Sequence, residues 1–228
     1  MGQVLAMTRL SVFCLVGAAA VLLAGCSSDP QTQRLINGAV PFVGQPEVTA
    51  NANFLAAYEA DAPGVAVVRD DTPDALAVAL RQTRSAQSGV ETMIAADGTQ
   101  FMLRKGILVG TRGLGNDLMA AEVTPVERLV SARGSGVATR LMTFIDGNDH
   151  AVTRAFKCDI YPGGLEDVTV GTTPIQTRLM TEYCRGPFGE FYNYYWVVPG
   201  SGEIVQSNQW AGPLTGKISL RKVPSVRS

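Results

Sequence analysis

From residue 64 onward, apolar and polar residues alternate with a period close to two, which is typical of half-buried β-strands. Short turn sequences, such as Pro162-Gly163-Gly164 and Pro199-Gly200-Ser201-Gly202, separate most of these segments and join neighbouring antiparallel strands. We predict strands at 64–69, 75–84, 90–96, 100–104, 107–111, 137–145, 151–160, 167–170, 175–183, 191–198, 203–210 and 217–222. The predicted fold class is therefore mainly β, an antiparallel meander that forms an open or half-closed barrel or sandwich.

Helical patterns are few in this part of the chain. Residues 53–60 combine helix formers with apolar side chains, so we expect a short helix there. A parallel sheet would need crossovers of about a dozen residues or more, and only 116–128 is long enough to supply one. A second short helix is expected within it, near residues 117–122.

The first 25 residues have the layout of a secretory signal peptide. Arg9 precedes an apolar segment at 10–24, and Leu23-Ala24-Gly25-Cys26 matches a lipobox, the signal at which a bacterial lipoprotein is cleaved and acylated. The alternative is a transmembrane helix, but about 15 apolar residues are fewer than the ~20 needed to cross a bilayer. We expect residues 1–25 to be removed and Cys26 to carry lipid, with no other cofactor.

Turn-forming residues such as Gly38, Pro41 and Pro46 run through residues 26–49, which we predict to be a flexible tether. A chain of this length has a root-mean-square reach of roughly 25–30 Å, enough to hold a domain off a membrane surface. Residues 50–228 are then a β-rich periplasmic domain. Bacterial lipoproteins are in general retained at the inner membrane when Asp follows the lipidated cysteine; here Ser27 follows it, so we expect an anchor in the outer membrane.

Composition and motifs argue against several classes of function. Loss of the leader removes Arg9 and leaves 18 of the 19 basic residues against 20 acidic ones, so no strongly basic field exists to attract nucleic acid. The single histidine, His150, has no Gly-x-Ser-x-Gly motif to accompany it, and we predict no enzyme and no catalytic residue. Gly110, Gly113 and Gly115 lack the spacing of a phosphate-binding loop and are expected to form a turn into a helix.

Two of the four cysteines remain available for pairing. Cys14 leaves with the leader and Cys26 takes lipid, so we predict a disulfide between Cys158 and Cys184 in the oxidising periplasm. The alternative is a pair of buried free thiols. A metal site is not expected, because neither cysteine has another cysteine or a histidine nearby at the spacing of zinc ligands.

Strand alternation supports this pairing from one side only. Segment 151–160 places Cys158 on its apolar face, toward the core. In segment 175–183, the apolar face carries Ile175, Leu179 and Tyr183. If the strand continued with the same alternation, Cys184 would point outward. Residues 185–187 are expected to end that strand, after which the pleat no longer fixes a direction.

The predicted hairpin at 191–210 is rich in aromatic and amide side chains. A four-residue turn would place Val198 opposite Glu203, and this register puts several pairs on one face: Phe191 with Trp210, Asn193 with Asn208, Tyr195 with Gln206, and Val197 with Ile204. Amide groups flanked by aromatic rings suit a sugar, whose hydroxyl groups need hydrogen bonds and whose C–H faces pack on rings.

We therefore predict a candidate contact with glycan or a partner at Asn193, Tyr195, Trp196, Gln206, Asn208 and Trp210. The alternative is that the aromatic rings fill a sheet core and that Asn193 and Asn208 hydrogen-bond to each other.

The same hairpin resembles the YjbF/GfcB family of exopolysaccharide and group 4 capsule lipoproteins. Members of that family carry an Asn-Arg-Tyr-Trp strand, a turn, and a strand that ends near Ser-x-Gln-aromatic-x-Gly. The chain differs at Tyr194, where the family usually has Arg, and matches at Asn193, Tyr195, Trp196, Ser207, Gln209, Trp210 and Gly212. Residues 106–109 and 113–118 give a second match.

The resemblance implies a β-rich, periplasm-facing outer-membrane lipoprotein of exopolysaccharide assembly or export, and it implies no catalytic residues. The function that we predict is a non-enzymatic accessory in exopolysaccharide or capsule assembly or export. Its expected partners are the membrane, through the lipid, and an outer-membrane polysaccharide export protein, with the polysaccharide as a further candidate. The alternative is a lipid or glycolipid carrier or binding module of the half-barrel type, which predicts a greasy interior cavity.

Mass spectrometry of the native protein tests the predicted processing. We expect a chain that begins at an acylated Cys26 and contains a Cys158–Cys184 disulfide. A leader that is still attached, or reduced thiols at both remaining positions, would contradict this prediction.

Overall fold

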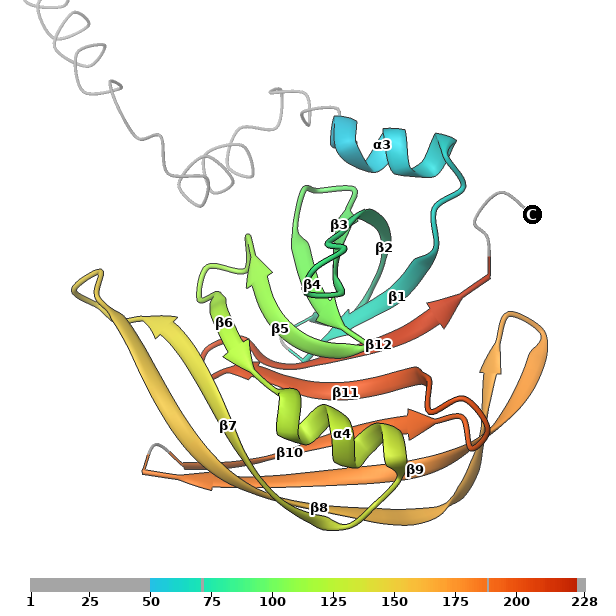
Figure 1. Cartoon of the computed structure of the whole chain (residues 1–228). Coiled ribbons are helices and arrows are strands. Elements are labelled where there is room, and N and C mark those ends of the chain that lie inside the picture. Colours follow the sequence, from blue (N-terminus) through green and yellow to red (C-terminus); the bar gives the residue numbers. More distant parts are fainter. Residues whose placement is uncertain (1–49, 71, 188, 225–228) are drawn as a thin grey trace, which may run out of the picture. The chain divides into compact units, whose positions relative to one another are not determined.

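The computed structural model describes residues 50–70, 72–187 and 189–224. The predicted signal peptide, Cys26 and the predicted tether lie outside these residues. In the part of the chain that the structure describes, no helix is long and apolar enough to cross a membrane. This part forms one antiparallel sheet of twelve strands with two short helices (Figure 1).

The strands are β1 (Gly64–Arg69), β2 (Thr72–Arg84), β3 (Val90–Ala95), β4 (Gln100–Arg104), β5 (Ile107–Arg112), β6 (Leu118–Glu122), β7 (Gly136–Ile145), β8 (Ala151–Val170), β9 (Thr173–Gly186), β10 (Gly189–Val197), β11 (Ile204–Gly212) and β12 (Gly216–Val223). Their order across the sheet is β5-β4-β3-β2-β1-β12-β11-β10-β9-β8-β7-β6. The sheet curls until β5 and β6 lie side by side, which makes a barrel that is nearly closed with one unsealed seam (Figure 1). The predicted fold class is confirmed.

Side chains bridge the seam between β5 and β6. The Thr111 hydroxyl accepts a hydrogen bond from the Leu118 N–H at 2.9 Å and donates one to the Asp117 carboxylate at 2.9 Å. The Arg112 guanidinium donates to the backbone oxygens of Leu118 and Met119, at 3.3 and 3.5 Å. These backbone groups are therefore hydrogen-bonded although the two strands form no ladder.

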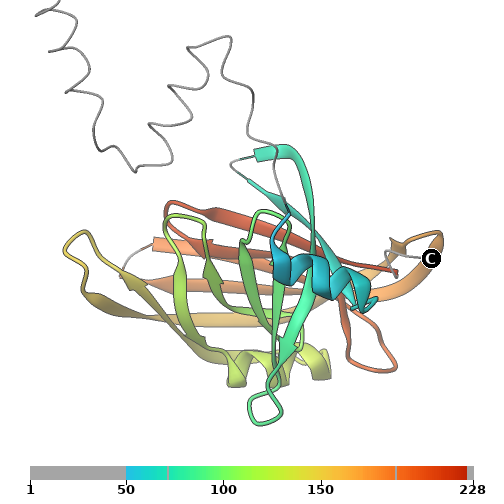
Figure 2. The same ribbon diagram turned by 90° about the horizontal axis from the view of Figure 1, so that it is seen from above.

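The two helices are α3 (Ala52–Glu59) and α4 (Thr124–Ala132). Helix α3 forms where we predicted it, because the Asn51 side chain caps its first turn by accepting from the Asn53 N–H at 2.9 Å. It packs against β2 and β3 (Figure 2). Helix α4 begins with a proline in its first turn, a position that favours helix initiation.

The helix predicted near residues 117–122 is wrong, because residues 118–122 form β6. The Asp117 carboxylate accepts hydrogen bonds from the backbone N–H groups of Gly113 and Leu114, at 2.9 and 3.2 Å. It stabilises the preceding turn in this way instead of capping a following helix. The predicted glycine turn is present, but it leads into a strand.

Strand β8 runs through Pro162-Gly163-Gly164, where we predicted a turn, so the predicted strands 151–160 and 167–170 are one strand. Its pairing with β9 shifts between Pro162 and Leu165, as in a β-bulge. A bulge accommodates a proline, which has no N–H to give to the ladder. The turn-like sequence therefore interrupts the pairing without ending the strand.

The Cys158–Cys184 disulfide joins residues that lie directly opposite each other on β8 and β9. Both residues are fully buried. Strand β9 continues beyond Cys184 to Gly186, so the pleat still fixes its direction there. The apolar pattern misled us because the inward face of β9 carries the buried Glu182, whereas Tyr183 faces outward.

We expect the variant Cys158→Ala/Cys184→Ala to lose about 3.5 kcal/mol of unfolding free energy, because the disulfide restricts the unfolded chain across a sequence separation of 26. Urea denaturation followed by tryptophan fluorescence measures this loss. A reductant should bring the wild-type protein to the level of the variant and leave the variant unchanged. Equal stability of the two proteins under oxidising conditions would contradict the prediction.

Candidate functional site

A pocket of about 690 Å³ lies at one end of the barrel. Its lining comes from the beginning of β1, β3 and β11, from the end of β2, β4 and β12, and from the β4–β5 and β10–β11 turns. In an antiparallel sheet, the end of one strand lies beside the beginning of its neighbour. Segments that are far apart in the chain therefore meet at this end of the barrel. The volume is typical of a small-molecule site.

Helix α4 covers only part of this end of the barrel. It contacts β7, β8 and β10, where Val126 and Val130 are buried, and Ser131 in its last turn lines the pocket. Gly202 in the β10–β11 turn has a φ of 73°, and a Cβ there would come within 2.7 Å of the Ser131 backbone oxygen. The helix end and this turn are therefore packed together, and the space beside them is the pocket.

Aliphatic side chains form the inner wall of the pocket. Six of them are at most 8% exposed: Val65, Met93, Leu103, Ile204, Val205 and Leu220. None of the described residues that line the pocket carries an aromatic ring. The wall offers a surface for aliphatic groups.

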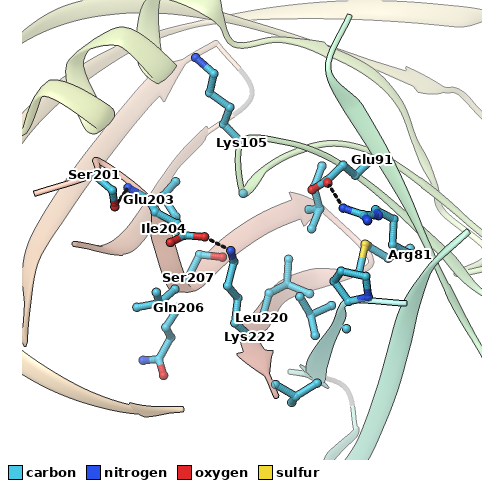
Figure 3. A pocket seen from close by; sticks show the side chains of 18 of the residues that line it. Arg81, Glu91, Lys105, Ser201, Glu203, Ile204, Gln206, Ser207, Leu220 and Lys222 are labelled. Carbon is cyan, nitrogen blue, oxygen red and sulfur yellow. Dashed lines mark hydrogen bonds and ion pairs between the residues drawn. The ribbon is translucent and has the colours of Figure 1, made fainter. Parts of the chain in front are cut away.

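Charged side chains surround the mouth of the pocket. Six charged residues line it, the bases Arg81, Arg84, Lys105 and Lys222 and the acids Glu91 and Glu203. Arg81 pairs with Glu91 at 3.0 Å, and Lys222 pairs with Glu203. These two ion pairs lie on opposite sides of the pocket (Figure 3).

Two of the acids near the mouth are each shared between two bases. Glu91, already paired with Arg81, also lies 3.9 Å from Arg84. The Glu127 carboxylate of α4 lies 2.8 Å from Lys105 and 2.9 Å from Arg104. The lining itself has four bases against two acids and so carries more positive than negative charge, which favours an anionic ligand.

A second cluster of charged and polar side chains is sealed inside the barrel. Arg140 of β7 and Glu182 of β9 form an ion pair at 3.1 Å, and both side chains are 0% exposed. Asn193 and Tyr195 of β10 donate hydrogen bonds to the Glu182 carboxylate at 2.7 and 2.6 Å. Arg140 also donates to the backbone oxygen of Leu108 in β5, at 3.1 Å. The cluster therefore connects four strands.

Two amide side chains extend this cluster to backbone groups. Gln209 of β11 accepts from the Leu108 N–H at 2.8 Å and donates to the Gly106 backbone oxygen at 2.9 Å. Asn193 accepts from the Trp210 N–H at 2.7 Å. Because β5 is an edge strand with a neighbour on one side only, the contact of Gln209 with the Leu108 N–H satisfies a backbone group that the sheet leaves unpaired.

The surroundings raise the pKa values of Tyr195 and Arg140, so both side chains keep their protons. Burial and the negative charge of Glu182 raise the pKa of Tyr195 well above its usual value, so its hydroxyl group stays a donor. Burial alone would lower the pKa of Arg140, but its attraction to Glu182 and hydrogen bonds to Glu182 and Tyr195 outweigh this effect and raise that pKa. The cluster is thus a fixed ion pair that joins strands.

The hairpin of β10 and β11 begins in the predicted register, with Val197 opposite Ile204. A β-bulge follows, after which Tyr195 lies opposite Ser207. The predicted pairs Asn193 with Asn208 and Tyr195 with Gln206 are therefore wrong. The bulge adds a residue to β11, so side chains that we assigned to one face lie on opposite faces.

Three of the six predicted contact residues contact the core. Asn193 and Tyr195 are fully buried and bonded to Glu182. Trp210 is half-buried, and its ring stacks on Phe191 with 4.4 Å between the ring centroids. These positions match the core-packing alternative, except that Asn193 bonds to Glu182 instead of Asn208.

The other three predicted residues, Trp196, Gln206 and Asn208, are half-buried and face away from this core. The Trp196 indole donates to Glu166 at 2.7 Å, and the Asn208 amide donates to Ser219 at 2.8 Å. Arg221 donates to Gln206. The bulge therefore divides the predicted set between the inside and the outside of the barrel.

A row of tyrosines that we did not predict, Tyr183, Tyr192 and Tyr194, lies on the outside of β9 and β10. The Tyr183 and Tyr192 rings stack with centroids 4.4 Å apart, and those of Tyr192 and Tyr194 are 6.3 Å apart. Arg185 and Lys217 cover the two ends of the row, at 5.0 and 5.1 Å. A hydrogen bond to Glu190 raises the pKa of Tyr183 to about 12. Alternation along β10 indicates this row once the register is known.

Sequence reasoning also missed the ion pair and the pocket. Arg140 occupies an inward position of β7 among apolar neighbours, which is a signal for a buried charge with a partner. The pocket left no such signal, because Arg81, Lys105 and Lys222 come from separate segments of the chain.

The fold and the site define a small β-barrel protein with a ligand-sized pocket at one end. The family model described as "Group 4 capsule polysaccharide lipoprotein gfcB, YjbF" matches residues 40–223, and the chain belongs to this family. The family resemblance predicted from the hairpin is confirmed.

Among solved structures, the crystal structure of the hypothetical lipoprotein YmcC from Escherichia coli (K12) is similar, with a TM-score of 0.61 and 14% sequence identity. The similarity covers 73% of this chain and 87% of that one, and it shows a shared fold. No curated protein matches the chain.

Removing one partner of the buried ion pair is expected to destabilise the barrel. Glu182→Gln leaves the Arg140 charge buried without a counter-ion, and we expect a loss of about 3–5 kcal/mol of unfolding free energy in urea denaturation. The double variant Arg140→Met/Glu182→Met should recover much of this loss. Glu190→Gln, an exposed control, should leave the unfolding midpoint unchanged. Wild-type stability of Glu182→Gln would contradict the structural role.

Proposed function

We propose that this protein is a lipid-anchored accessory of capsule or exopolysaccharide assembly or export, held at the periplasmic face of the outer membrane. The observation that carries the proposal is membership of a family described as capsule polysaccharide lipoproteins. The lipobox that ends at Cys26, with Ser27 after it, supports the anchor and its place.

The protein acts, in this proposal, by binding and not by catalysis. The acid and base of its interior ion pair, Glu182 and Arg140, are fully buried and bonded to each other. They therefore serve to join strands and not to exchange protons with a substrate. The open pocket instead presents an aliphatic wall and a charged mouth, which are features of a binding site.

Two parts of the surface suit two kinds of contact. The tyrosine row and the neighbouring Trp196 offer aromatic edges and hydroxyl groups on the outside of the barrel, which suits a protein partner of the export apparatus or the polysaccharide. The pocket suits a small ligand. A second candidate function, a carrier or binding module for lipid or glycolipid, is favoured by the aliphatic wall of this pocket.

Polysaccharide export in a deletion strain, and in that strain with each of three plasmids, tests the proposed function. We expect a deletion strain to lose export and a plasmid with the wild-type gene to restore it. Cys26→Ala, which removes the site of acylation, should restore export poorly although the domain is still made. The matched variant Ser28→Ala should restore it fully. Normal export in the deletion strain would refute the accessory role, and full restoration by Cys26→Ala would refute the need for the anchor.

A further inference from the structure

We infer that the pocket at the end of the barrel binds an anionic amphiphile. Its aliphatic chain lies along the inner wall, and its phosphate or carboxylate head rests at the mouth among Arg84, Lys105 and Lys222. This inference rests on the proposed binding role and names the class of ligand. The wall, the charge of the mouth and the position in the barrel each support it.

The wall of the pocket selects for aliphatic groups. Met93, Leu103 and Leu220 come from three different strands and face a common space, with 4%, 5% and 4% of their surfaces exposed. A hydrocarbon chain that enters this space removes apolar surface from water at roughly 25 cal/mol per Å². Sugars bind most often against aromatic faces, and the described lining has none. The tail of a lipid therefore fits the wall better than a sugar ring.

The mouth of the pocket selects for negative charge. Four bases and two acids line the pocket, and the bases at the mouth reach into water, with the Arg84 and Lys105 side chains 63% and 70% exposed. Glu91 and Glu127 each lie between two bases, so one carboxylate balances the charge of two cations only in part. An anionic head group can therefore take a place beside these cations and form charge-assisted hydrogen bonds.

The position of the pocket sets the orientation of the ligand. The aliphatic residues lie within the strands, whereas Lys105 is in the β4–β5 turn and Lys222 is next to the last residue of β12. Chain and head group are thus separated along the strand direction, with the charge at the outer end. A bound lipid would expose its head group, and anything attached to it, at the end of the barrel.

Photo-crosslinking of the full, lipidated protein tests this inference. The protein is placed in nanodiscs of zwitterionic phosphatidylcholine and exposed to dodecyl phosphate that carries a diazirine at its tail. We expect crosslinks, mapped by mass spectrometry, on the peptides that contain Met93, Leu103 or Leu220. The matching diazirine dodecanol, which has no charge, should label these peptides about tenfold less, since it lacks the charge-assisted contacts.

Charge variants at the mouth locate the head group. Lys105→Met/Lys222→Met keeps the aliphatic stems and should lower labelling by dodecyl phosphate about tenfold while labelling by dodecanol stays unchanged. Lys157→Met, on the outside of β8, is the matched control and should label as wild type. A diazirine fatty acid in a parallel arm distinguishes a carboxylate source from a phosphate source, and labelling by either supports the inference.

Three results would overturn it. Equal labelling by the alcohol would show that the pocket does not select for negative charge. Crosslinks only outside the pocket would show that the probe binds elsewhere. Displacement of the probe by inorganic phosphate or an oligogalacturonate at equal concentration would show that the ligand is not an amphiphile. The crosslinking result and the export result can be told apart. Loss of export on deletion without pocket labelling refutes the ligand alone, and pocket labelling with normal export refutes the accessory role alone.

Discussion

The ion pair between Arg140 and Glu182 holds the barrel together next to the place where its sheet fails to close. Burying two charges costs several kcal/mol each, and this cost is offset only when their remaining hydrogen-bonding positions are filled. Asn193, Tyr195 and the backbone oxygen of Leu108 fill most of them, and the Arg140 Nε is left without a hydrogen-bond partner among the described residues. Leu108 belongs to β5, an edge strand of the sheet. The pair thus links the edge strand to β7, β9 and β10 across the interior of the barrel.

The meander could be predicted from the sequence because short turns and alternating side chains are local properties. The exceptions also have local causes. Asp117 bonds backward to Gly113 and Leu114 and so leads into a strand, and Pro162 is absorbed by a bulge within β8. The hairpin register depends on one bulge in β11, and no residue in its sequence marks that bulge. The prediction that Asn193 and Asn208 share a face was wrong because it assumed a register without the bulge.

The pocket could not be predicted, because it is a product of topology. Its charged residues come from strand ends and turns that meet only when the sheet curls, and α4 packs mainly on β7, β8 and β10 beside it. The buried ion pair is intermediate. Arg140 was detectable as a charge at an inward position, but its partner on β9 was hidden because Glu182 made an inward face look polar.

Strand β1 pairs with β12 along its whole length, from Gly64 opposite Val223 to Arg69 opposite Ile218. The first and last strands of the domain are therefore neighbours at the centre of the sheet. When the chain emerges from its amino terminus, as in synthesis, β1–β5 and β6–β11 are complete before β12, the strand that pairs with both β1 and β11. Contacts of such long sequence separation form late and slowly. Until the final eight-residue strand arrives, both halves keep exposed edges that invite pairing with other chains, so this protein benefits from protection while it is incomplete.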